Sequence, residues 1–229
     1  MTAMPLPKFT YLDLKGFGEA IRLALYIGNV QFEDHLVSRA ECVEMEKAGK
    51  LPFGQVPVLE VDGEIYAQSG VILKWAGRQS GLYPEDEKLQ MRCDEIYDTL
   101  TDIKRVLFPA WHGGICGRNP FTKQPLVPIP DELKGDVLKG LNEVWLPYRM
   151  GQLERALEKF GGPYFCGARM TICDLEFYVM GLGFLTECYV DGVKSTIMDG
   201  CPLLKQLVER VGNNPKVTEW NALHPNSHY

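Results

Sequence analysis

The stretch FGQVPVLEVDGEIYAQSG, residues 53–70, holds residue types that could bind a ligand through backbone groups. Pro57 lies inside an apolar run, where it removes a hydrogen-bond donor that a central β-strand needs. Gln68 and Ser69 open a helical pattern, and the free N–H groups and dipole of a helix N-terminus favour an anion. A simpler reading makes Ser69 only the N-cap, and the two roles are compatible.

These residues lie in a chain long enough for two small domains. It has 229 residues, 45% of them hydrophobic. Thirty acidic against 24 basic residues give a net charge of −6, which disfavours nucleic acid and anionic membranes as partners. The apolar stretch 177–185 is too short to span a bilayer, and the N-terminal residues lack the pattern of a secretory signal. We therefore expect a cytoplasmic protein.

The cysteines predict neither a disulfide framework nor a zinc site. Their number is odd and no C-x-x-C pair occurs. Most are expected to be buried thiols that pack like small apolar residues. They are Cys42, Cys93, Cys116, Cys166, Cys173, Cys188 and Cys201.

The first part of the chain predicts the order β-α-β-α-β-β-α. Apolar periodicity and turn residues place a hairpin around Asp62-Gly63 and end the last helix near Gly81 and Pro84. The other expected elements are a strand at 8–12, a helix at 18–29, a strand at 30–37 and a short helix at 40–50.

Beyond Pro84 the pattern is helical, with almost no strand signal. A proline-rich loop, 113–130, interrupts it. Thr171 and Asp174 form a capping-box signature, to which we assign a folding role. The expected helices cover 88–112, 133–160, a run after Thr171, 202–212 and 215–223. The pattern predicts two domains, 1–84 and an all-helical 85–229.

The order of several motifs resembles the cytosolic glutathione transferases, nearest the sigma-type members that include haematopoietic prostaglandin D synthases. The motifs are YLDLKGFGEAIRL, LPFGQVPVLEVDG, AQS, DTLTD and TICDLEF. The resemblance implies an α+β, thioredoxin-like N-terminal domain that binds glutathione as co-substrate. It also implies an all-α domain that contributes the electrophile pocket, a homodimer, and no metal.

The resemblance also assigns roles to residues. Tyr11 would stabilise the glutathione thiolate, because a thiol of pKa about 8.5 is only about 3% ionised at pH 7. A cis Pro57 would turn the N–H and C=O of Val56 outward toward the cysteinyl unit, and Gln68 and Ser69 would hold the γ-glutamyl carboxylate. The alternative for Tyr11 is packing at the strand end.

Two positions depart from the family pattern. Phe17 stands where relatives often carry arginine, and Cys42 where many carry tryptophan. Lys47 or Lys50 would then hold the glycyl carboxylate, and the sequence does not choose between them. Asp102 aligns with an acidic residue that reaches the α-amino group of glutathione across the dimer; its alternative is an ordinary solvated charge.

The electrophile pocket and the reaction are less defined. The loop 113–130 is expected to form one wall of the pocket, and Phe53 either inserts into the partner subunit or packs locally. The pocket is expected to contain Phe17, Arg105, Phe108 and Trp111, for which core packing competes as an explanation. Conjugation to small hydrophobic electrophiles is the predicted function, with prostaglandin-type isomerisation or non-catalytic ligand binding as alternatives.

Overall fold

The computed structural model describes residues 5–109 and 130–225. The first part has the predicted order β-α-β-α-β-β-α, so that prediction is confirmed. Its elements are β1 Lys8–Leu12, α1 Glu19–Ile27, β2 Glu33–Val37, α2 Arg39–Lys47, β3 Val58–Val61, β4 Glu64–Ala67 and α3 Ser69–Ser80. The second strand and second helix are shorter than expected.

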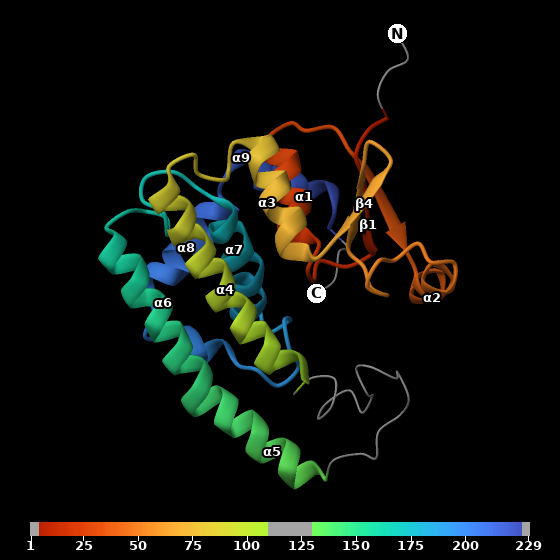
Figure 1. Ribbon diagram of the computed structural model, residues 1–229. Coiled ribbons are helices and arrows are strands. Elements are labelled where there is room, and N and C mark those ends of the chain that lie inside the picture. Colours follow the sequence, from red (N-terminus) through yellow and green to blue (C-terminus); the bar gives the residue numbers. More distant parts are fainter. Residues whose placement is uncertain (1–4, 110–129, 226–229) are drawn as a thin grey trace.

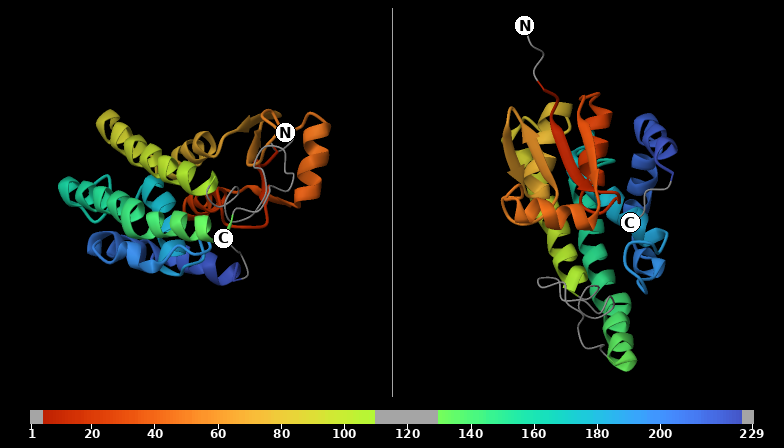
Figure 2. Two further views of the ribbon diagram at one scale, coloured as in Figure 1. Left: turned by 90° about the horizontal axis from the view of Figure 1, so that it is seen from below. Right: turned by 90° about the vertical axis from the view of Figure 1, so that its right-hand side faces the viewer.

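The four strands form one mixed sheet in the order β2-β1-β3-β4. β1 runs parallel to β2 and antiparallel to β3, and β3 and β4 form the hairpin. At its tip Asp62 and Gly63 both have positive φ, +52° and +84°, as a two-residue hairpin turn requires. Helices α1 and α3 pack together on one side of the sheet and α2 lies on the other (Figures 1 and 2). This arrangement is the expected thioredoxin-like one.

Among its described residues, the second part consists of helices and connecting loops, with a single isolated β-bridge between Tyr164 and Gly167. Its helices are α4 Glu87–Pro109, α5 Asp131–Gly140, α6 Leu146–Phe160, α7 Ile172–Leu185, α8 Pro202–Gly212 and α9 Pro215–Leu223. The last two match their predicted bounds. Residues 81–86 connect α3 with α4, and the domain boundary after 84 stays a prediction. Among the described helices, none combines the length and the apolar character needed to cross a bilayer.

The predicted helix 133–160 contains a π-helical turn at Leu141–Trp145. Pro147, at the start of α6, explains the irregularity. Proline has no N–H, so it cannot donate to the carbonyl of Glu143, and the hydrogen-bond pattern of the helix changes there. A short 3-10 helix, Ser195–Met198, was not predicted.

Helix α7 is the centre of the helical part and packs against α1, α4 and α8 (Figure 1). Its N-terminus carries the expected capping box. The buried Asp174 carboxylate accepts hydrogen bonds from the Thr171 N–H (2.7 Å), the Thr171 hydroxyl (2.7 Å) and the Phe165 N–H (2.8 Å). Thr171 and Asp174 therefore join the preceding loop to the start of the central helix.

We predict that Thr171→Ala lowers the free energy of unfolding by about 1 to 2 kcal/mol, because it removes a capping side chain. Urea denaturation measures this change. Thr186→Ala, at the exposed other end of α7, is the matched control and should cost less. A Thr171→Ala protein of unchanged stability but reduced activity would contradict the folding role.

Candidate functional site

Tyr11, near the end of β1, is the centre of the candidate site. Its side chain is only 4% exposed. The backbone N–H of Phe17 donates a hydrogen bond to the Tyr11 hydroxyl oxygen at 3.1 Å. Burial raises the pKa of Tyr11 above its ordinary value, although the Phe17 N–H and the charge of Lys104 act in the opposite direction. The hydroxyl is therefore neutral near pH 7, and since Phe17 uses one of its lone pairs, its O–H remains a donor.

Two glycines in the turn after β1 leave room for the Tyr11 ring. A Cβ atom on Gly18 would lie 2.5 Å from Tyr11 Cδ1, and one on Gly16 would lie 2.7 Å from the hydroxyl oxygen. Gly16 also has a positive φ of +37°, which side chains other than glycine rarely adopt. The turn can approach the ring this closely because both residues lack side chains.

Arg22, buried on α1, holds the same turn through backbone carbonyl groups. Its guanidinium donates to the carbonyl oxygens of Leu14 (2.9 Å) and Leu12 (3.2 Å). It also binds both carboxylate oxygens of Asp34, at 3.2 and 2.9 Å, and its central carbon lies 5.7 Å from the centre of the Tyr11 ring. The two hydrogen bonds to Leu12 and Leu14 thus hold the strand end that carries Tyr11, and the Asp34 carboxylate fixes the guanidinium that donates them.

A buried ion pair of the helical part reaches the other side of the site. Lys104 on α4 pairs with Glu176 on α7, and both side chains are buried. The Lys104 ammonium lies 4.8 Å from the centre of the Phe17 ring. Burial lowers the pKa of Lys104, but the Glu176 carboxylate outweighs this and leaves the pKa above its ordinary value. Lys104 is therefore a positive charge held next to the segment that binds Tyr11.

Tyr189 is coupled to the same ion pair. Burial raises its pKa to about 12, while the nearby charge of Lys104 acts to lower the pKa. Tyr189 is consequently neutral at physiological pH. Two neutral tyrosine hydroxyls and one lysine–glutamate pair make this region polar within an otherwise apolar core.

The residues expected to bind the backbone of glutathione lie at the start of α3 and before β3. The Val56-Pro57 bond is cis, as expected, with Pro57 buried and Val56 half-buried. Within the described part of the chain, Val56 makes no backbone hydrogen bond. Gln68, the residue before α3, has the unusual φ of +76°, and such backbone conformations concentrate at functional sites. Ser69 is half-buried beside it.

The other residues predicted for the site lie on the protein surface or outside the residues that the structure describes. Lys47 forms an ion pair with Glu44 at 2.8 Å, and Lys50 is exposed. Asp102 pairs with Arg105 at 3.1 Å on the exposed face of α4. Cys42 is half-buried, and burial raises its pKa. The side chain of Phe108, Trp111 and the loop 113–129 lie outside the described residues.

Sequence reasoning missed the residues that support Tyr11. Lys104 does carry a signal, because it shares the helical spacing of the apolar Leu100, Ile103 and Leu107. Glu176 carries a similar sequence signal, since it lies in a helix that is apolar on all sides. A charge on a buried face needs a partner, and these two residues could have been paired on that ground.

Comparison with known proteins agrees with this fold. Residues 7–78 match the family model described as "Glutathione S-transferase, N-terminal domain". Residues 130–224 match that described as "Glutathione S-transferase, C-terminal domain". The protein thus belongs to the glutathione S-transferase family. It is an enzyme that uses glutathione as co-substrate and transfers groups to its sulfur.

Individual relatives are similar over nearly their whole length. Glutathione S-transferase 1 of Ascaris suum is 32% identical, covering 99% of this chain and all of the relative. Hematopoietic prostaglandin D synthase of Gallus gallus is 30% identical, covering 97% of this chain and 98% of the relative. The crystal structure of the Ascaris lumbricoides glutathione S-transferase has a TM-score of 0.77 at 30% identity, covering 98% of this chain and 100% of that one.

We predict that Gly18→Ala lowers kcat/KM for glutathione conjugation on the order of 100-fold, because the added methyl group displaces the Tyr11 ring. The measurement is a steady-state assay at saturating electrophile. Gly140→Ala adds a methyl group where no atom lies within 4 Å, so it serves as the control and keeps its activity. Equal activity of the two variants would show that the close approach to Tyr11 does not matter.

Proposed function

We propose that this chain conjugates the thiolate of glutathione to small hydrophobic electrophiles, with Tyr11 as the hydrogen-bond donor to the sulfur. The observation that carries the proposal is the buried, neutral Tyr11 hydroxyl, whose oxygen accepts from Phe17 and whose hydrogen is free to be donated. A donor in a desolvated site favours the charged form of its acceptor.

The energy required is modest. Lowering the pKa of a thiol by about 2 units needs about 2.7 kcal/mol of preferential stabilisation of the thiolate. One charge-assisted hydrogen bond contributes about 1.5 to 3 kcal/mol. The positive charge of Lys104 has the sign that assists a nearby anion, although Glu176 offsets part of it.

For glutathione itself, we assign the cysteinyl backbone to Val56 beside Pro57 and the γ-glutamyl carboxylate to Gln68 and Ser69. The half-buried Val56 without a backbone partner among the described residues supports the first contact. The N-terminus of α3 supports the second.

We favour Lys50 over Lys47 for the glycyl carboxylate. The Lys47 ammonium is already paired with Glu44. No ion pair of Lys50 is found within the described ranges, so its charge is available to a ligand.

The electrophile would lie against Phe17, with Lys104 behind it. An aromatic face with a buried ammonium nearby suits an apolar molecule that carries a carbonyl or other acceptor oxygen. Arg105, Phe108 and Trp111 stay predictions for this pocket, because Arg105 is exposed and the other two side chains are outside the description.

Isomerisation of a peroxide substrate is the second candidate. Relatives named hematopoietic prostaglandin D synthase, at 30% and 28% identity, favour it. The same thiolate would attack the peroxide oxygen, so the choice depends on the shape of the pocket and not on Tyr11.

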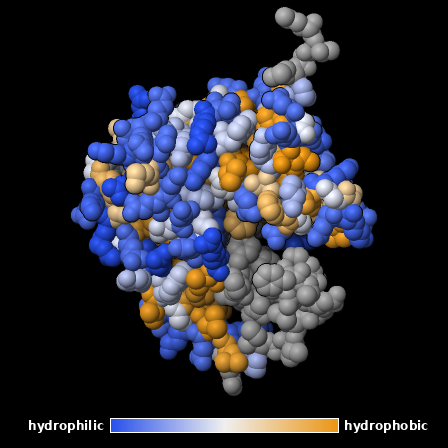
Figure 3. Space-filling model, in the orientation of Figure 1, coloured by the Kyte–Doolittle hydropathy of each residue, from blue (hydrophilic) through white to orange (hydrophobic). Residues whose placement is uncertain are grey.

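We further propose a cytoplasmic homodimer. Exposed apolar side chains lie on β4, α3 and α4, and Figure 3 shows hydrophobic residues gathered over the hairpin. The exposed apolar side chains on β4, α3 and α4 include Ile65, Tyr66, Val71 and Met91. One solved relative, a hookworm transferase at 27% identity and a TM-score of 0.77, covering 98% of this chain and all of that one, is described as monomeric. The association state therefore needs its own test.

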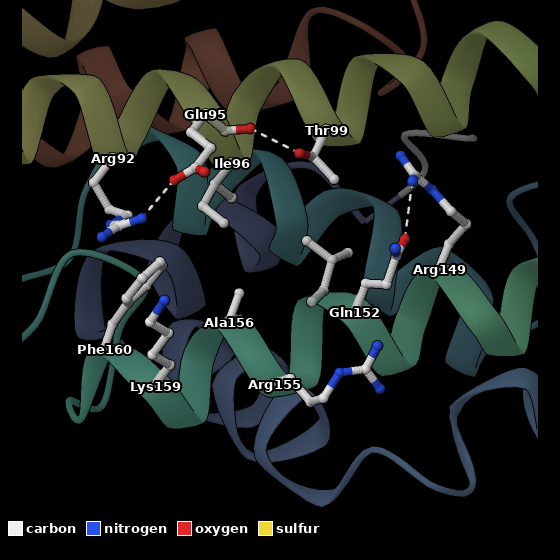
Figure 4. Close-up of a pocket in the computed structure, with 11 residues that line it drawn as sticks. Arg92, Glu95, Ile96, Thr99, Arg149, Gln152, Arg155, Ala156, Lys159 and Phe160 are labelled. Carbon is white, nitrogen blue, oxygen red and sulfur yellow. Dashed lines mark hydrogen bonds and ion pairs between the residues drawn. The ribbon is translucent and has the colours of Figure 1, made fainter.

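Phe53 is the anchor that this dimer would use. It is 69% exposed. A groove between α4 and α6 contains the apolar Ile96, Ala156 and Phe160, and charged side chains such as Arg92 and Lys159 line it as well (Figure 4). We propose that Phe53 of one subunit enters this groove on the other, and that Asp102 then comes near the partner's bound glutathione.

Tyr11→Phe tests the catalytic proposal. It should raise the apparent pKa of bound glutathione by about 2 units and lower kcat/KM at pH 6.5 on the order of 10 to 100-fold. Thiolate absorbance and pH–rate profiles measure the two effects. Tyr148→Phe, at an exposed tyrosine on α6, is the control. Retention on immobilised glutathione with an unchanged thiol pKa would remove Tyr11 from the mechanism.

Phe53→Ser tests the dimer. It should convert the protein from a dimer to a monomer at micromolar concentration, as measured by light scattering after gel filtration. Leu223→Ser changes a similarly exposed side chain, 62% accessible, on α9 and should leave the dimer intact. A wild-type monomer, or a Phe53→Ser dimer, would refute the proposed anchor.

A further inference from the structure

Three cysteine thiols, which we call the thiol cluster, meet in the helical part. Cys93 comes from α4, Cys173 from the first turn of α7, and Cys166 from the loop between α6 and α7. Their sulfur atoms all lie within 4.8 Å of one another, and the Cys166 and Cys173 sulfurs are 4.0 Å apart. Cys93 is far from the other two in the sequence, so no spacing motif predicted the cluster.

We propose that the thiol cluster binds a single thiophilic d10 cation, of the class Zn²⁺, Cd²⁺ and Cu⁺, through its three sulfurs. With metal–sulfur bonds of about 2.3 Å, three sulfurs around one ion stand about 3.8 to 4.0 Å apart. The Cys166–Cys173 separation of 4.0 Å has this value, and the other two separations are no greater than 4.8 Å. Soft thiolate ligands select these ions over Mg²⁺ and Ca²⁺, which prefer oxygen.

The loop that carries Cys166 is already held in place. Tyr164 and Gly167 exchange two backbone hydrogen bonds, of 3.1 and 3.0 Å, across a tight turn. Between them, the Phe165 N–H donates to Asp174 at 2.8 Å. Cys166 therefore does not need to be ordered when an ion binds, which lowers the entropic cost.

Cys173 and Cys93 are equally fixed, because both are fully buried on packed helices. The Thr171 hydroxyl oxygen lies 3.2 Å from the Cys173 sulfur. Because the single hydrogen of this hydroxyl is donated to Asp174, its oxygen accepts from the Cys173 thiol before an ion binds. The ion would link α4 to the start of α7.

Charge also suits a soft cation. Cys166 is half-buried as a residue, while Cys93 and Cys173 are fully buried. The Asp174 carboxylate is occupied by hydrogen bonds from Thr171 and Phe165, so it contributes negative potential and not a ligand. Because the thiols must lose protons when the ion binds, affinity should rise with pH.

The thiol cluster lies away from the part of the site that holds Phe17 and Lys104. Cys93 precedes Lys104 by eleven residues on α4, which corresponds to about 16 Å along the helix. Ion binding would therefore stabilise the fold without entering the transfer reaction.

Cadmium titration of the full chain tests this proposal, with thiols reduced, metals removed and glutathione absent. One equivalent of Cd²⁺ should saturate a thiolate-to-cadmium charge-transfer absorption and raise the Tm, because the ion binds the preformed three-sulfur site more tightly than it binds the thiols of the unfolded chain. An equal concentration of Mg²⁺ should do neither. No saturation at one equivalent would overturn the proposal.

Two variants and one chemical measurement separate the cluster from the other thiols. Cys166→Ala should weaken the one-equivalent binding on the order of 100-fold or more, whereas Cys188→Ala, an exposed cysteine outside the cluster, should titrate like wild type. In the wild-type protein, Cd²⁺ should protect Cys166 from iodoacetamide, as read by mass spectrometry. Unaltered labelling of Cys166, or equal binding by the two variants, would contradict a site in the cluster.

Discussion

The hydrogen bond from the Phe17 N–H to the Tyr11 oxygen is the interaction on which the candidate site depends. It fixes the hydroxyl at the end of a buried strand and leaves its hydrogen for a ligand. The bond exists because the turn between β1 and α1 folds back over the ring, and this approach requires glycine at 16 and 18. Arg22 then holds the turn through backbone carbonyls. The position of the Tyr11 hydroxyl thus depends on a turn whose conformation and glycine residues are constrained.

The helical part closes the site through two polar contacts with the first part. Lys104, paired with Glu176, lies against the Phe17 ring. The Trp220 indole N–H donates to the buried Glu19 on α1 at 2.9 Å. Through these contacts, α4 and α7 support the turn before α1, and α9 is joined to α1 itself. Contacts from both parts of the chain therefore position Tyr11.

Much of this architecture could be predicted from local signals. The hairpin follows from Asp62-Gly63 and the start of α7 from its capping box, because such motifs satisfy backbone groups locally. The π-helical turn was missed, since its cause, Pro147, acts on a hydrogen bond within a continuous helix. The partners of Tyr11 and the thiol cluster were missed because tertiary packing joins residues that no local pattern links.

The central claim is that Tyr11 is a neutral hydrogen-bond donor throughout the working pH range. A titration of the protein with ¹³Cζ-labelled tyrosine, with the Tyr11 resonance assigned by comparison with Tyr11→Phe, measures this most directly. Burial should keep the Tyr11 pKa above its ordinary value of 10.0, so its resonance should not shift below about pH 9. Ionisation of Tyr11 near pH 7 would make it a base and would contradict the account.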